Sequence, residues 1–164
     1  MKEFLQGRRL GFALRSHLAF MAGGLALGVT IADLMAWLGL GARDTNGYAI
    51  VAQWLCVATL LLAGVAAIAA ATERFDIIEE ERGLAQLDIL AAIAVIVLYG
   101  ASAFLRSLEL GNPAPSTAPF LLAIAGLIVI FVDAGLAANL YSSREWEELE
   151  EEPARDHRRR RISR

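Results

Sequence analysis

The chain has 164 residues, of which 57% are hydrophobic and 20% are charged, and its formal net charge is -3. Soluble domains are typically about 45–50% apolar, and here the apolar residues gather in long blocks without helical or strand periodicity. This pattern excludes an ordinary soluble domain and predicts an all-α integral membrane protein. With Cys56 as the single cysteine, an intramolecular disulfide, a CxxC redox pair and a cysteine-based metal site are excluded as well.

Four apolar stretches, each bounded by charge, predict four transmembrane helices. They cover residues 18–40, 48–72, 87–105 and 118–141. About 20 helical residues cross a hydrocarbon core about 30 Å thick, so each stretch is long enough. The first is too long for the apolar region of a signal peptide and is expected to remain as a membrane helix. Glycine, asparagine and proline in the links favour tight turns, which predicts an up-down-up-down bundle.

The flanking segments predict the orientation of the bundle. Of the 15 lysines and arginines, 13 lie in the basic segment 1–17, the link 73–86 and the tail 142–164. These three segments share one side of the membrane if there are four spans. Lysine and arginine near helix ends favour the cytoplasmic side. We therefore expect both termini in the cytoplasm and the chain in a bacterial inner membrane.

Three polar residues of the spans are predicted to meet near the outer end. By helical rise, Asp33 lies about 10 Å and Gln53 about 8 Å from that end, which predicts a hydrogen bond between them. Arg106, at the outer end of the third helix, can reach toward the same site. The group is either a structural link or a polar cavity or ion site. In the structural interpretation, Asp33→Asn should be tolerated because an amide still bonds to Gln53.

A second polar group is predicted near the inner end. His17 opens the first helix, Asp88 opens the third and Asn139 closes the fourth. His17 is either an interfacial polar residue or a group that titrates beside carboxylates. Asp133 lies about 12 Å deeper along the fourth helix by helical rise. A charge in hydrocarbon costs several kcal/mol, so Asp133 is expected to be protonated or to face a water-filled cavity.

The sequence contains few residues of the kinds that bind cofactors or catalyse reactions. A bis-histidine haem needs two axial ligands, whereas the chain has only His17 and His157, the latter in the polar tail. Nucleotide-binding loops, catalytic triads and zinc spacings are absent from the sequence. We therefore expect no cofactor, no metal and no enzymatic activity.

The tail predicts contact with the membrane surface. Six arginines follow the acidic run of the tail. A cluster of this kind on the cytoplasmic side is typical of segments that bind anionic lipid headgroups. The arginines are Arg155, Arg158, Arg159, Arg160, Arg161 and Arg164. The run is alternatively a solvated topology signal. Nucleic-acid binding is not expected, because no folded module accompanies the run.

Three segments, Ser16-His17-Leu18, Ile31-Ala32-Asp33-Leu34 and the start of the second stretch at Gln53-Trp54-Leu55, resemble parts of a family of bacterial four-helix inner-membrane proteins known as a domain of unknown function. Ser16-His17-Leu18 and Ile31-Ala32-Asp33-Leu34 resemble the ends of that family's first helix, which opens with His-Pro, although Leu18 stands where the family has proline. Gln53-Trp54-Leu55 and the alanines and glycine after it resemble its second helix. Asp88 stands where members often carry a histidine. The resemblance implies an accessory role near membrane redox enzymes.

These observations favour one function and leave two alternatives open. The first is an accessory, scaffold or anchor subunit that binds a membrane-protein partner or a second copy of itself. The second is a small oligomeric proton-coupled transporter that uses Asp33 and Asp133. The third is a redox subunit at a quinone or haem interface.

Overall fold

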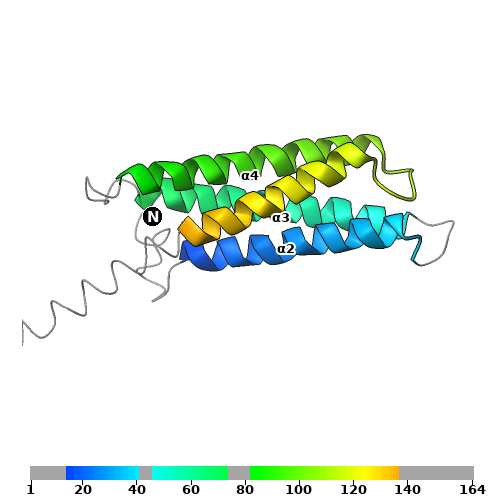
Figure 1. The fold of residues 1–164 in the computed structure, drawn as a ribbon, viewed down its shortest axis with the longest axis horizontal. Coiled ribbons are helices and arrows are strands. Elements are labelled where there is room, and N and C mark those ends of the chain that lie inside the picture. The colour runs from blue at the N-terminus through cyan, green and yellow to red at the C-terminus, as the bar shows by residue number, and fades with distance from the viewer. Residues whose placement is uncertain (1–13, 41–45, 74–81, 137–164) are drawn as a thin grey trace, which may run out of the picture.

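The computed structural model describes residues 14–40, 46–73 and 82–136. Within these ranges the chain forms four α-helices and no strand. They are α2 (Leu14–Trp37), α3 (Gly47–Glu73), α4 (Arg82–Leu108) and an unlabelled fourth helix (Thr117–Leu136), drawn yellow to orange in Figure 1. All four are long and apolar enough to span a membrane, with mean hydropathies of 1.8 to 2.3. The predicted all-helical architecture with four membrane-length helices is confirmed.

The helix boundaries differ from the predicted ones mainly where polar residues continue a helix. Helix α2 begins at Leu14 and α4 begins at Arg82, before the apolar stretches from which they were predicted. Hydropathy marks the part of a helix that suits lipid, whereas backbone hydrogen bonding continues into polar residues that favour helix. The link between α3 and α4 is therefore shorter than its polar composition indicates.

Helix α2 ends in a glycine cap. Gly39 has a φ of 63°, in the left-handed region that glycine enters at little cost. Its N–H donates to the Ala36 carbonyl at 3.1 Å, and the Leu40 N–H donates to the Met35 carbonyl at 3.0 Å. This pair of bonds is a Schellman motif, and it stops the helix three residues before the apolar stretch ends. The fourth helix begins at Thr117, so Pro119 lies in its first turn, as predicted.

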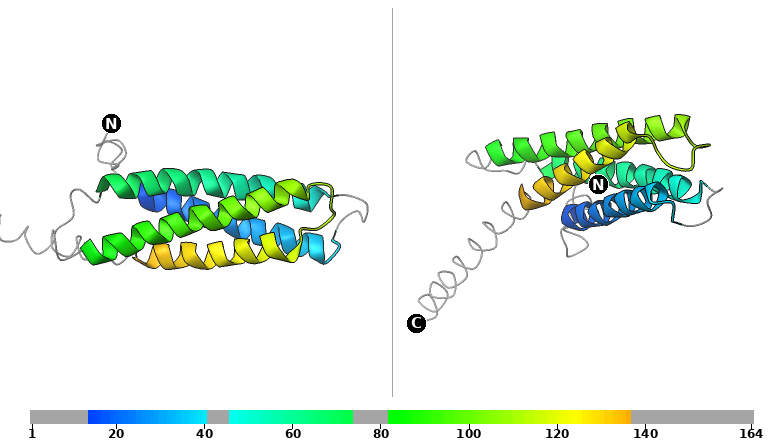
Figure 2. Two further views of the ribbon diagram at one scale, coloured as in Figure 1. Left: turned by 90° about the horizontal axis from the view of Figure 1, so that it is seen from above. Right: turned by 45° about the vertical axis from the view of Figure 1, so that its right-hand side comes forward.

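The four helices lie side by side along one direction, and the chain passes back and forth between the two ends of the bundle (Figures 1 and 2). Helix α3 packs against both α2 and α4. The fourth helix contacts α2 through the rings of Trp37 and Phe120 and contacts α4 through a bond from Tyr99 to Ala123. Helix α2 starts at the end of the bundle where the described part of the fourth helix stops. We call this the first end and the opposite one the second end.

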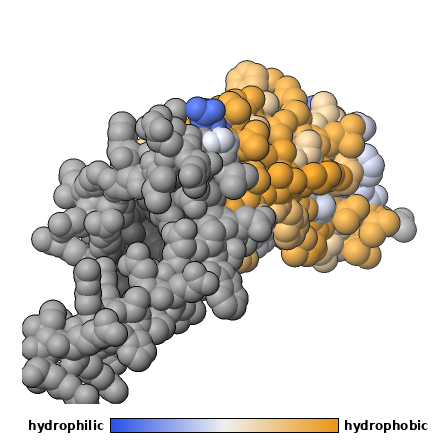
Figure 3. All heavy atoms as spheres, turned by 60° about the vertical axis from the view of Figure 1, so that its left-hand side comes forward, coloured by the Kyte–Doolittle hydropathy of each residue, from blue (hydrophilic) through white to orange (hydrophobic). Residues whose placement is uncertain are grey.

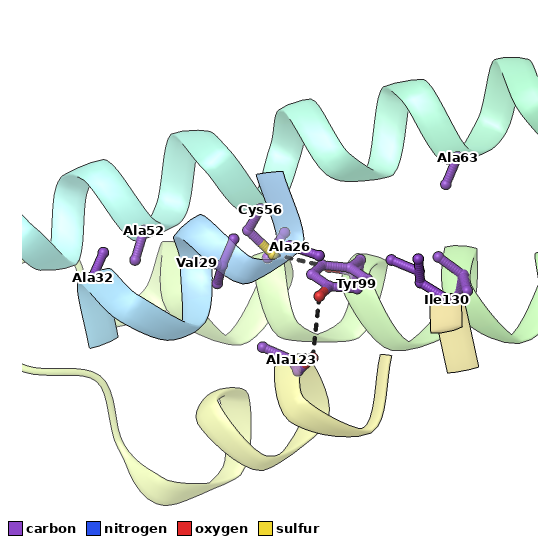
Figure 4. Close-up of a cluster of buried hydrophobic side chains, with 11 residues drawn as sticks. Ala26, Val29, Ala32, Ala52, Cys56, Ala63, Tyr99, Ala123 and Ile130 are labelled. Carbon is purple, nitrogen blue, oxygen red and sulfur yellow. Dashed lines mark hydrogen bonds between the residues drawn. The ribbon is translucent and has the colours of Figure 1, made fainter. Parts of the chain in front are cut away.

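The core is built from small side chains with one large ring among them. Ala26, Val29, Cys56 and Ala123 are buried around the fully buried Tyr99 (Figure 4). Small residues allow close approach of helix backbones, which is the usual way helices pack in lipid. The large apolar side chains point outward instead, and apolar surface covers most of the described part in Figure 3. This distribution is the reverse of a soluble bundle and suits a lipid surrounding.

Candidate functional site: a buried ion pair and an alanine-lined crevice

A bidentate ion pair joins α2 to α4 near the second end. Arg106 Nη1 donates to Asp33 Oδ1 at 2.6 Å, and Arg106 Nη2 donates to Asp33 Oδ2 at 2.5 Å. Asp33 is 0% exposed and Arg106 is 3% exposed. The guanidinium fork matches the two carboxylate oxygens, so the two buried charges compensate each other.

The same arginine is tied to the fourth helix through a serine. Arg106 Nε donates to Ser102 Oγ at 3.1 Å, and Ser102 Oγ donates to the Pro119 carbonyl at 2.8 Å. Ser102 lies one turn before Arg106 on the same face of α4, so it reaches both partners. The cluster Asp33–Ser102–Arg106–Pro119 therefore connects three helices, and we call it the outer clamp.

The predicted hydrogen bond between Asp33 and Gln53 is wrong. Both carboxylate oxygens of Asp33 accept from Arg106, and Gln53 Oε1 is buried without a hydrogen-bond partner in the described part of the chain. A guanidinium offers a full charge and two parallel donors, whereas an amide offers one neutral donor, so the carboxylate takes the stronger partner. The prediction that Arg106 reaches the site of Asp33 is confirmed.

Tyr99 and Ser102 are buried polar residues of the core that the sequence analysis did not single out. Tyr99 Oη donates to the Ala123 carbonyl at 3.1 Å, and Cys56 Sγ donates to the Tyr99 carbonyl at 3.5 Å (Figure 4). Tyr99, Ser102 and Arg106 are three and four residues apart, which places them on one face of α4. The sequence alone could have shown this, because three polar residues on one face of an apolar helix predict that this face packs against polar partners on another helix.

The second end is closed further by contacts from the connecting segments. Trp37 Nε1 donates to the Pro115 carbonyl at 2.9 Å, and the Trp37 ring lies 4.8 Å from that of Phe120. Asn46 Nδ2 donates to the Leu110 carbonyl at 2.6 Å. These bonds attach the segment between α4 and the fourth helix to α2 and to the start of α3. Arg106, Ala49 and Pro115 help to line a shallow hollow at this end, of about 220 Å³ when counted out to its open side.

An open crevice lies toward the first end, between all four helices. Its empty space is about 400 Å³ when counted out to its open side. Six alanines and two branched apolar residues line it, together with one acid, Asp133. They are Ala19, Ala22, Ala63, Ala66, Ala70, Ala92, Val95 and Ile130. Asp133 therefore helps to line a mostly apolar crevice, and its expected protonation or contact with a water-filled cavity stays a prediction.

The other predicted inner residues are placed as follows. His17 is exposed at the start of α2, and Asp88 is 2% exposed in the first turns of α4. Asp88 and Asp133 therefore lie toward the same end of the bundle. Asn139 and the six tail arginines lie outside the described residues. Among the residues described, no group of three or more His, Cys, Asp or Glu side chains is arranged to hold a metal ion.

Comparison of the chain with protein-family models, with curated proteins and with solved structures finds no match.

Proposed function

We propose that this chain is a multi-pass protein of a bacterial inner membrane and acts there as an accessory, scaffold or anchor subunit. The lipid environment is supported by the exposed apolar side chains, such as Phe20 at 74%, Leu61 at 65% and Phe131 at 62% exposed. Such side chains around a bundle would aggregate in water, and in a bilayer they face acyl chains.

The orientation belongs to the same proposal. Four spans return the chain to the side on which it started, and 13 of the 15 basic residues fall in segments on that side. The positive-inside rule then puts both termini in the cytoplasm. The arginine-rich tail would meet anionic headgroups there, together with a membrane-protein partner or a second copy of the chain.

The scaffold role is carried by one observation, the outer clamp. Intramembrane charges often mark a path for ions or protons, but Asp33 and Arg106 bond to each other with little exposure, and Arg106 also bonds to Ser102. Tyr99 fills the core beside the clamp and bonds to the fourth helix. An ion moving through the bundle would have to break this cluster. The polar side chains of this half hold helices together, as expected of a rigid support.

The test is purification of the full chain in a mild detergent, with mass spectrometry of every component retained. We expect a partner protein in constant ratio, and we expect that ratio to fall when the six tail arginines are replaced by glutamine. The matched control is Asp133→Asn, which should leave the ratio unchanged because the support does not use that acid. A folded chain that purifies alone, in every detergent and at native expression, contradicts the proposal.

A second candidate, a small proton-coupled transporter, is favoured by the crevice at Asp133. Proteoliposomes that contain a pH-sensitive dye separate it from a scaffold. A transporter gives a proton flux that Asp133→Asn abolishes while the protein remains folded. A scaffold gives the same low flux in wild type and variant.

A further inference from the structure

Four leucines at the second end lie where helices end or just beyond them, and all four are exposed. Leu38 and Leu40 follow the end of α2 and are 72% and 49% exposed, and Leu108 closes α4 and is 70% exposed. Leu110 lies in the link between α4 and the fourth helix and is 42% exposed (Figure 1). Exposed apolar patches mark surfaces that meet a membrane or another protein. We call these four leucines the leucine rim and expect them to contact something other than water.

The leucine rim continues the outward apolar faces of α2 and α4. In α2, Ile31 and Leu34 are 50% and 43% exposed, and the Leu38 N–H donates to the Leu34 carbonyl at 2.9 Å, so Leu38 extends the same face by one turn. In α4, Phe104 is 64% exposed and Leu108 lies four residues after it. Because these outward faces are the ones that suit lipid, the same surrounding would extend to the rim.

The link between α4 and the fourth helix has few backbone N–H groups that need water. The N–H groups of Glu109 and Asn112 donate to carbonyls within the chain at 3.0 and 2.8 Å. The Ser116 N–H donates to the carboxylate of Glu109 at 3.0 Å, which also occupies the one charged side chain of this link. Pro113 and Pro115 have no N–H to satisfy. A short surface loop in water has no need of this degree of internal bonding.

Two carbonyls of the same link are bonded by side chains from other parts of the bundle. The Leu110 carbonyl accepts from Asn46 Nδ2 at 2.6 Å, and the Pro115 carbonyl accepts from Trp37 Nε1 at 2.9 Å. In lipid each backbone group must find its partner within the protein, because no water is present to replace it. The link is therefore bonded in the way that a poorly hydrated layer requires.

We propose that the leucine rim and the link between α4 and the fourth helix are immersed in the interfacial layer of one bilayer leaflet, with the leucines against lipid. The inference rests on the membrane location proposed above. It means that the second end offers little water-facing surface to a soluble partner. A partner of the scaffold would then contact the sides of the bundle or the segments at the first end.

The experiment places nitroxide labels on the full chain in vesicles of phosphatidylethanolamine and phosphatidylglycerol. Leu40→Cys and Leu110→Cys test the rim, Val97→Cys on the outward face of α4 gives the hydrocarbon reference, and the exposed Asn112→Cys gives the aqueous one. The native Cys56 is buried, so the wild type supplies the labelling blank. Electron paramagnetic resonance then compares collisions of each label with oxygen, which concentrates in lipid, and with a water-soluble nickel chelate.

We expect the ratio of oxygen to nickel collisions at both rim positions to be several-fold higher than at Asn112→Cys and to approach that at Val97→Cys. Ratios equal to the one at Asn112→Cys would overturn the proposal. Rim labels that neither reagent reaches would overturn it too, because a protein partner or a second copy would then cover the rim. A low ratio at Val97→Cys as well would overturn the membrane location itself, which separates the two failures. Circular dichroism melts confirm folding, and Leu38→Cys replaces either rim variant that does not fold.

Discussion

At the scale of single residues, Asp33 and Arg106 depend on each other. Each is almost completely buried, and each supplies the charge that the other needs. Arg106→Met leaves a buried carboxylate without its counter-charge, and breaking such a pair typically costs about 3–5 kcal/mol. Asp33→Asn leaves the guanidinium instead, so the tolerance expected from a bond to Gln53 is reversed. We expect both variants to unfold at clearly lower temperature in detergent.

The double variant Asp33→Leu with Arg106→Met is the control for this prediction. Apolar replacement of a whole buried ion pair is often neutral, so the double variant should be more stable than either single variant. Losses that simply add in the double variant would show that the two residues act independently. In that case the outer clamp is not the unit of stability described above.

A second residue, Gly126, fixes the distance between α4 and the fourth helix. A Cβ placed there would lie 2.5 Å from Tyr99 Cε2, and the ring of Tyr99 is fully buried. Gly126→Ala therefore overpacks the core and should lower the unfolding free energy by about 1–3 kcal/mol. Gly24→Ala is the matched control, because Gly24 is exposed and nothing lies within 4 Å of its added Cβ. Equal melting temperatures for the two variants would contradict the tight contact.

At the scale of elements, Trp37 attaches the segment between α4 and the fourth helix to α2. Its Nε1 donates to the Pro115 carbonyl, and its ring packs on Phe120. Trp37→Phe keeps an aromatic ring but leaves the Pro115 carbonyl without this donor. It should therefore lower the free energy of unfolding by about 0.5–1.5 kcal/mol, measured by thermal unfolding. Trp54→Phe, at a position 68% exposed, should change stability by less. A larger loss for Trp54→Phe would show that the exposed ring, and not this bond, holds the bundle.

The elements themselves were predictable because hydropathy and length decide whether a stretch can be a membrane helix. The partners of the polar residues were not predictable in this way, because depth along a helix says nothing about the direction in which a side chain points. Asp33 and Gln53 share a depth, yet the carboxylate bonds to Arg106 on α4. The spacing of Tyr99, Ser102 and Arg106 contained that information, since it defines one face of α4. The crevice is lined by residues from all four helices, so only the packing of these helices together could produce it.

At the scale of the whole molecule, acidic side chains of the spans lie toward both ends of the bundle. At the second end the buried Asp33 pairs with Arg106, and toward the first end lie the buried Asp88 and Asp133, which helps to line the crevice. The core between the two ends is filled by Tyr99 and small side chains. The outer clamp at the second end supports the scaffold proposal.

The ion pair also sharpens the expected orientation. Arg106 is one of only two basic residues in the outer links predicted from sequence, and its charge is bound inside the bundle by Asp33. Arg43 is then the remaining basic residue on that side, so the asymmetry toward the other side is larger than the count alone indicates. A reporter that is active only outside the cytoplasm should be silent when fused after Arg164. The same reporter fused after Asn112, in the link between α4 and the fourth helix, should be active. Activity after Arg164, with silence after Asn112, would invert the orientation and place the crevice toward the outer side of the membrane.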